Sequence, residues 1–220
     1  MDHVEWHATS FTERDQILRW FPGAKVHVAQ NLPPHLAKAP SSPSEGITFL
    51  SVGRVHPIKN YPFAADCLRR LAEQSGHAIA YRVVGPIEDP AEREKITANA
   101  TPALTCETVG EMPPDQLAQE FQQANALLVP SLTENYGQVI AEALGQGVPV
   151  IASDQTPWGQ FPASPVLQCL PLDTQSWLKA ITPLIDLNHR ATLIALAQAY
   201  FSEHLLDDTI LGAHLQLLQP

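Results

Sequence analysis

Short apolar runs recur along the chain and are separated by stretches with helical periodicity. Each run is four to seven residues long, which is typical of a buried strand and too short for most helices. The runs lie at residues 47–52, 78–84, 104–109, 126–129, 148–152 and 166–170. The pattern therefore predicts about six strands, most of them buried on both faces.

Polar and apolar positions between these runs repeat with the period of a helix. The expected helices span residues 61–73, 90–98, 114–122, 137–144 and 174–185, followed by 189–201 and 202–217. Asn60, Asp89 and Asp173 precede three of them as candidate N-caps. Strands that alternate with helices pair in parallel, so the pattern predicts an α/β fold with a doubly wound, Rossmann-like parallel sheet.

The chain divides into four segments. Residues 1–30 hold a predicted helix over 12–20 and a short strand over 25–29, with Ile17, Leu18 and Phe21 expected on the buried face of the helix. Residues 31–46 are rich in proline and serine and lack an apolar period, as linkers do. Residues 47–188 carry the strand–helix alternation, and residues 189–220 are expected to form C-terminal helices.

Composition narrows the class of protein. The 220 residues are 45% hydrophobic and 16% charged, enough apolar material for a full core. A net charge of −10 argues against a general nucleic-acid binder, whose surface would be basic. Three widely spaced cysteines fit neither a disulfide framework nor a zinc site, which favours reduced thiols and a cytoplasmic protein. No apolar run is long enough to span a bilayer.

Candidate chemistry concentrates in the loop and helix that follow the run at 126–129. Gly137 opens the predicted helix, and a helix start offers free N–H groups and a positive dipole end to an anion. We expect this anion between Tyr136 and Gln138. Glu134 lies before it and Glu142 lies about 7 Å along the helix axis beyond Gly137. This spacing suits a phosphate flanked by hydroxyl groups, as in a sugar nucleotide.

The two carboxylates differ in how far they support a site. A glutamate ahead of a helix often does no more than stabilise the helix dipole, and this interpretation stays open for Glu134. Glu142 has apolar neighbours on both sides, which predicts a helix that is largely buried. A buried carboxylate is costly without a partner, and a ligand rich in hydroxyl groups would supply one.

A basic loop follows the run at 47–52, at the end of a strand where open α/β sheets bind ligands. Arg54 offers a planar fork for phosphate oxygens and Lys59 offers a point charge, while Gly53 precedes them both. Ordinary surface charge is the alternative interpretation. The chain has 13 lysines and arginines against 23 acidic residues, so two cations at one strand end favour a function.

Four stretches of the chain resemble one family. Glu134 and Glu142 are separated by seven residues, as in the E-x7-E motif of retaining glycosyltransferases with the GT-B fold, those of the glycosyl transferases group 1 or family 4 type. Asn135, Tyr136 and Gly137 resemble the turn after its first glutamate, and residues 147–153 resemble its G-x-P-V-I-x-S strand. Residues 53–60 resemble its diphosphate-binding loop. The chain is thus similar to the C-terminal, donor-binding half of the GT-B fold.

The resemblance implies a function and a set of site residues. The domain would bind a nucleotide-diphosphate sugar for retaining glycosyl transfer, without a metal ion or other cofactor. Catalytic roles would fall to Arg54, Lys59 and Glu134. The donor-binding set would comprise Gly53, Arg54, Lys59, Met112, Glu134, Asn135, Tyr136, Gly137, Gln138 and Glu142, with the turn before Met112 near the nucleobase.

The family also implies partners for this segment. An acceptor glycan or lipid would bind to an N-terminal domain that this chain lacks, and residues 1–30 would be its remnant. We therefore expect weak or no turnover by this chain alone. We expect no nucleic-acid partner, and the resemblance allows peripheral association of a full-length protein with a membrane. The alternatives are a non-catalytic nucleotide-sugar-binding or partner module of a two-chain enzyme, and an isomerase or phosphorylase on the same fold.

Trp158 is expected in the core, because tryptophan side chains are mostly buried.

Overall fold

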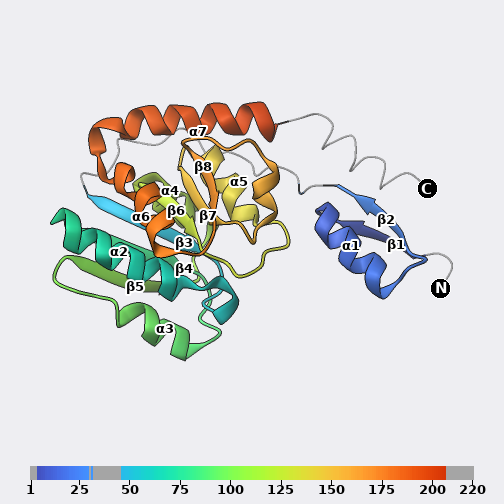
Figure 1. Ribbon diagram of the computed structural model, residues 1–220, viewed down its shortest axis with the longest axis horizontal. Coiled ribbons are helices and arrows are strands. Elements are labelled where there is room, and N and C mark those ends of the chain that lie inside the picture. The colour runs from blue at the N-terminus through green and yellow to red at the C-terminus, as the bar shows by residue number, and fades with distance from the viewer. Residues whose placement is uncertain (1–3, 30, 32–45, 207–220) are drawn as a thin grey trace.

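The computed structural model describes residues 4–29, 31 and 46–206, and its main body is a six-stranded sheet (Figure 1). All neighbouring strands pair in parallel, in the order β5-β4-β3-β6-β7-β8. The strands are β3 Ile47–Val52, β4 Ile79–Val84, β5 Leu104–Gly110, β6 Ala126–Val129, β7 Val150–Ser153 and β8 Leu167–Leu170. The predicted fold class is confirmed, with the predicted bounds for β3 and β6.

The strand order reverses at the centre of the sheet. From β3 the chain moves outward to β4 and β5, then returns to β6 on the other side of β3 and continues to β7 and β8. The loops after β3 and β6 therefore leave adjacent strands in opposite directions. In open α/β sheets this switch point is where ligands bind, at the carboxyl ends of the strands.

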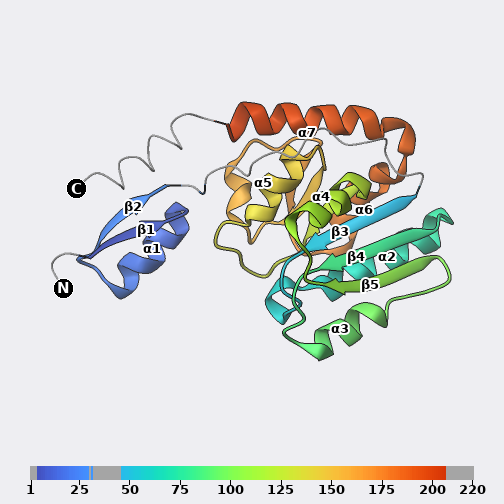
Figure 2. The same ribbon diagram turned by 180° about the vertical axis from the view of Figure 1, so that it is seen from behind.

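Helices cover both faces of the sheet (Figures 1 and 2). One face carries α2 Tyr61–Ser75, α3 Pro90–Thr97 and α6 Thr174–Ile181, and the other carries α4 Pro114–Gln123 and α5 Gln138–Gly145. The long helix α7 Arg190–His204 packs against α5. Short 3₁₀ turns are η1 Pro57–Lys59, η2 Pro157–Gln160, η3 Thr182–Ile185 and η4 Leu187–His189.

Two hydrophobic clusters fill the space between the helices and the sheet. Successive side chains of a strand point to opposite faces, so Phe49 joins the cluster under α2 while Leu50 joins the cluster under α5. Leu128 and Leu127 divide in the same way on β6. Because both faces are covered, the central strands read as continuous apolar runs, which is why the sequence predicts them well.

Residues 4–29 form a separate strand–helix–strand unit, in which β1 Glu5–Ala8 pairs in parallel with β2 Lys25–Val28 (Figure 1). The helix between them, α1 Phe11–Trp20, is capped by Ser10, whose hydroxyl accepts from the Glu13 amide. The prediction of a buried α1 face is wrong, because no residue of α1 is buried. The sequence also missed β1, whose four residues contain no apolar run.

Other predictions need correction at element ends. Asn60 does not cap α2 with its side chain, because it adopts the left-handed conformation with a φ of 54°. Asp89 and Asp173 cap α3 and α6 as predicted. The expected break between two C-terminal helices at residue 202 is absent, since α7 continues to His204. The linker from 32 to 45 and residues 207–217 lie outside the described part of the chain.

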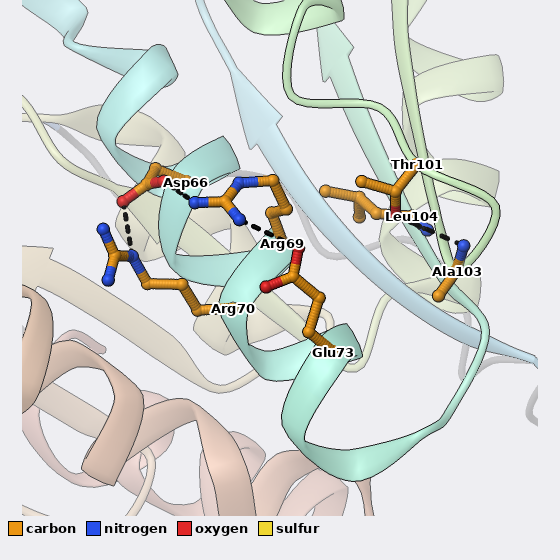
Figure 3. Close-up of polar contacts among 7 residues, drawn as sticks. All are labelled: Asp66, Arg69, Arg70, Glu73, Thr101, Ala103 and Leu104. Carbon is orange, nitrogen blue, oxygen red and sulfur yellow. Dashed lines mark hydrogen bonds and ion pairs between the residues drawn. The ribbon is translucent and has the colours of Figure 1, made fainter.

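The amino ends of the strands are held by side chains that bond to backbone groups. Asn125 accepts from the Thr48 amide at 3.0 Å and donates to the Leu184 carbonyl at 3.0 Å. Thr101 closes the turn before β5 by accepting from the amides of Ala103 and Leu104 (Figure 3).

An ion-pair network lies along α2. Arg69 bonds to Asp66 at 2.6 Å and to Glu73 at 2.8 Å, while Arg70 bonds to Asp66 at 2.8 Å (Figure 3). These pairs are solvent-accessible and join side chains three or four residues apart on one helix, so each stabilises α2 only slightly. Within the described residues, no helix is both long and apolar enough to cross a bilayer.

Candidate functional site

The loops after β3 and β6 meet at the switch point of the sheet. The Lys59 Nζ atom lies 2.6 Å from the Glu134 Oε2 atom, and the Leu132 amide donates to the Ile58 carbonyl at 2.8 Å. A side-chain contact and a backbone contact thus join two segments that are 75 residues apart in sequence. Two of the motifs that the sequence singles out are therefore neighbours in space.

Local structure fixes the position of Lys59 at the end of η1. Pro57 begins this 3₁₀ turn, and the His56 ring nitrogen Nδ1 accepts from the Ile58 amide at 3.2 Å. Asn60 then turns the chain through the left-handed region into α2. A histidine, a proline and an asparagine in series therefore hold the backbone on both sides of the lysine, which aims it across the carboxyl edge of the sheet.

The ion pair is largely shielded from water. The side chains of Lys59 and Glu134 are 17% and 15% exposed. Ser131, which is buried, adds a hydroxyl donor to the same Glu134 oxygen at 3.3 Å. Charges in such a place interact more strongly than on an open surface, because water screens them less. A charged ligand that displaced one partner would meet the same weak screening.

An aromatic group holds the turn that precedes α5. Trp158 is buried, and its indole N–H donates to the Tyr136 carbonyl, while its ring packs against those of Tyr136 and Phe161. Gly137 follows with a φ of 77°, which favours glycine. A Cβ there would lie 3.1 Å from the Glu134 Cγ atom, so the turn and the carboxylate are in close contact. The prediction that Trp158 lies in the core is confirmed.

Glu142 lies in the second turn of α5, between buried alanines, and is half-buried. Its carboxylate makes no hydrogen bond with the residues that the structure describes. Burial raises the pKa of this carboxyl above its ordinary value, because removal from water disfavours the charged form. An acceptor with unused capacity beside a helix start is what a hydroxyl-bearing ligand requires.

Arg54 has a different partner. Its guanidinium is exposed and forms an ion pair with Glu88 at 2.9 Å, on the loop between β4 and α3. Gly53 before it has a φ of 141°, and a Cβ there would lie 2.8 Å from the Tyr61 hydroxyl and 3.6 Å from the Lys59 Cε atom. The Gly53 backbone, which carries no side chain, therefore lies between the Lys59 side chain and the Tyr61 hydroxyl.

Comparison with known proteins decides the family. Residues 35–159, more than half of the chain, match the family described as glycosyl transferases group 1. This chain belongs to that family.

Relatives of this glycosyl transferases group 1 domain include D-inositol 3-phosphate glycosyltransferases. The protein of Acidothermus cellulolyticus is 31% identical over 119 residues, which are 50% of this chain and 27% of the relative. That of Mycobacteroides abscessus is 32% identical over 109 residues, 46% of this chain and 23% of the relative. The matches thus span about a quarter of these relatives' own length.

Solved structures share the fold at low sequence identity. TarM superposes with a TM-score of 0.79 at 16% identity, over 98% of this chain and 43% of TarM. Anabaena HepE, in complex with UDP and glucose, has a TM-score of 0.75 at 19% identity, over 96% of this chain and 61% of HepE. Sucrose-phosphate synthase from Thermosynechococcus elongatus has a TM-score of 0.72 at 24% identity, over 96% of this chain and 57% of the synthase. The likeness confirms the predicted GT-B half.

The remaining predicted site residues of the domain lie around the same edge. Asn135 is exposed beside the Gly137 turn, and Gln138 is the half-buried first residue of α5. Met112 follows β5 and is half-buried against the hydrophobic cluster under α5. Their part in ligand binding stays a prediction. Among the described residues, no three or more His, Cys, Asp or Glu side chains cluster as metal ligands do.

The sequence missed three residues that contact the predicted site residues. Ser131 and Glu88 bond to Glu134 and Arg54, and Tyr61 packs beneath Gly53. Glu88 and Tyr61 give no signal because neither lies within a spacing typical of a motif.

Proposed function

We propose that this domain binds the diphosphate of a nucleotide sugar at the carboxyl edge of its sheet and serves as the donor-binding half of a retaining glycosyltransferase. The ion pair between Lys59 and Glu134 carries the proposal, because it joins the diphosphate-type loop to the E-x7-E motif at the switch point. Membership of glycosyl transferases group 1 supports it, as does a fold shared with HepE, whose structure holds UDP and glucose.

Each side chain has a role that follows from its chemistry. Lys59 and the free amides at the start of α5 bind the diphosphate, since both present positive charge to oxygen atoms. Glu134 accepts hydrogen bonds from the sugar hydroxyls and fixes the ring. Glu142 accepts from the ribose hydroxyls, which fill the capacity that its carboxylate leaves unused.

Binding requires an exchange of partners. In the structure Lys59 is held by Glu134, so a diphosphate must draw the ammonium away, and its multiple charges make it the stronger competitor. Arg54 must leave Glu88, which costs little because exposed ion pairs contribute roughly 0–1 kcal/mol. Both cations then face the phosphate oxygens, and Glu134 becomes available to the sugar.

Transfer follows from the electrostatics of this arrangement. The bond from the sugar to the phosphate breaks through an oxocarbenium-like state, and the leaving diphosphate gains negative charge. Lys59, Arg54 and the amides around Gly137 stabilise that developing charge without a metal ion. Removing one such donor typically slows an enzyme by about 100- to 1,000-fold.

The acceptor side is proposed to lie elsewhere. The chain matches only about a quarter of the length of its curated relatives, so the acceptor glycan or lipid would bind to another domain or another chain. The second arrangement is our alternative, a donor-binding module of a two-chain enzyme. The GtfA/B complex supports it, with a TM-score of 0.74 over 99% of this chain.

A cytoplasmic location is proposed because the three cysteines are free thiols. Burial raises the pKa of each of these thiols.

Calorimetric titration with uridine, adenosine and guanosine diphosphates and their sugar conjugates tests the proposal. We expect micromolar to millimolar binding of one nucleotide, and a loss of about 100-fold in Lys59→Ala, which removes the charge facing the phosphate. Lys25→Ala is the matched control, because Lys25 also pairs with a glutamate but lies in the separate unit at residues 4–29. The proposal is wrong if the wild-type chain binds none of these compounds.

A further inference from the structure

Two buried tyrosines of the donor domain differ in one respect. Tyr81 on β4 is fully buried, and its hydroxyl bonds to the Ser51 hydroxyl at 2.8 Å, which in turn donates to the Leu128 carbonyl at 2.6 Å. Tyr61, the first residue of α2, is 3% exposed, yet its hydroxyl has no hydrogen-bond partner among the described residues. One phenol is therefore satisfied in the core, and the other is not.

A buried hydroxyl without a hydrogen-bond partner lowers the stability of the folded protein. Buried polar groups in folded proteins are nearly always hydrogen-bonded, because an unpaired one loses its contacts with water and gains nothing. A phenylalanine would fill the same space under α2 with no such loss. The hydroxyl of Tyr61 is therefore a hydrogen-bond donor that a bound group could satisfy.

The surroundings of this hydroxyl indicate which state that is. It lies against the bare backbone of Gly53, where an added Cβ would be 2.8 Å from the oxygen. The same point lies 4.0 Å from the Lys59 Nζ atom, and Lys59 holds Glu134. Burial first, and the Glu134 charge second, raise the pKa of Tyr61 well above its usual range. The phenol therefore stays protonated and remains a hydrogen-bond donor at every physiological pH.

We propose that Tyr61 is a further binding residue of the donor site, whose hydroxyl donates a hydrogen bond to an oxygen of the bound diphosphate. This inference rests on the proposed function. When the diphosphate draws Lys59 away from Glu134, the lysine side chain moves off Gly53 and uncovers the phenol beneath it. A phosphate oxygen above Gly53 then accepts a hydrogen bond from the Tyr61 hydroxyl, which has no partner among the described residues.

The role differs from that of the two cations. A neutral donor adds no long-range attraction, so Tyr61 contributes only when a phosphate oxygen lies directly above Gly53. It therefore fixes where the diphosphate sits, while Lys59 and Arg54 supply most of the charge. An unphosphorylated nucleoside has no oxygen at that position and gains nothing from the phenol.

Tyr61→Phe separates the binding role from a structural one, because the two roles predict opposite signs for stability. The variant keeps the ring and removes only the unpaired hydroxyl, so the midpoint of urea unfolding without ligand should stay unchanged or rise. Its affinity for the nucleoside diphosphate that binds the wild type should fall about tenfold, as expected for a hydrogen bond to a charged acceptor. Affinity for the matching nucleoside should not change.

Tyr81→Phe is the matched control. It removes an equally buried phenol that already has a partner, so its urea midpoint should fall while its diphosphate affinity stays at the wild-type value. Tyr61→Phe with wild-type diphosphate affinity would overturn the inference, as would a fall in its urea midpoint equal to that of Tyr81→Phe. A wild-type chain that binds no diphosphate would refute the proposed function itself, which is a distinct result.

Discussion

The two ends of the central sheet treat their polar groups differently. At the amino end, Asn125 bridges the Thr48 amide and the Leu184 carbonyl, and Arg190 donates to the carbonyls that end α4. At the carboxyl end, the Tyr61 hydroxyl and the Glu142 carboxylate find no hydrogen-bond partner in the described part of the chain. The Asn125 side chain thus has protein partners for both its donor and its acceptor, whereas the Tyr61 hydroxyl and the Glu142 carboxylate have none among the described residues.

The difference separates stability from function along one set of strands. Asn125 at the amino end already makes its hydrogen bonds within the protein, so a change there should affect folding and leave binding alone. Groups at the carboxyl end have capacity to spare, so changes there should affect binding and leave folding nearly intact, or even improve it. Unsatisfied polar groups are rare in folded proteins, so the Tyr61 hydroxyl and the Glu142 carboxylate support the proposed site at the carboxyl ends of the strands.

The largest expected effect is on stability, in Asn125→Ala at the amino end. The change leaves the Thr48 amide and the Leu184 carbonyl without partners, so we expect a loss of about 2–4 kcal/mol of unfolding free energy in urea titrations. Diphosphate affinity of the folded fraction should match the wild type. Asn99→Ala, which removes a solvent-exposed hydrogen bond to the Lys95 carbonyl near the end of α3, should cost less than about 0.5 kcal/mol. Equal losses in the two variants would contradict the assigned role of Asn125.

A smaller effect, confined to binding, is expected for Arg54→Ala. Its ion pair with Glu88 is exposed, so the unfolding free energy should change by less than about 0.5 kcal/mol, while diphosphate affinity should fall about tenfold in calorimetry. Arg70→Ala, which removes an equally exposed pair on α2, should leave affinity unchanged (Figure 3). If the two variants bind alike, Arg54 takes no part in the site.

The smallest effect concerns Glu142→Gln, which should be slightly more stable than the wild type at pH 7. The folded pKa of Glu142 is raised above its unfolded value, so the charged carboxylate costs stability at neutral pH, and this cost vanishes as the pH falls below about 4.3. The two stability curves should therefore converge near pH 4. Glu94→Gln, at an exposed position, should have the same unfolding free energy as the wild type at every pH between 4 and 7.

The same variant also tests which part of the ligand Glu142 holds. If its carboxylate accepts from the ribose, Glu142→Gln should weaken a nucleoside diphosphate and leave inorganic pyrophosphate unaffected in competition assays. Equal weakening of both ligands would show that the carboxylate acts on the phosphates and that its proposed role is wrong.

Prediction from the sequence succeeded where the signal is local. The runs at 47–52 and 126–129 became β3 and β6 with their predicted bounds, because strands covered on both faces are apolar throughout. It failed for β1, because Glu5–Ala8 carries no apolar run; this strand pairs in parallel with β2 through the backbone, and the Glu5 side chain contacts Lys25 and His27. It also failed for the α1 face, since periodicity shows that a helix is amphipathic and not what covers it.

The sequence by itself determined the strand–helix order, the family motifs and the residues that could bind a donor. Only the tertiary structure decided that Lys59 meets Glu134 across 75 residues, that Arg54 pairs with Glu88, and that no described residue bonds to the Tyr61 hydroxyl. The reason is physical. Strand and helix signals lie in residues close together along the chain, whereas a partner for a charge or a hydroxyl is set by which loops the order of the strands brings side by side.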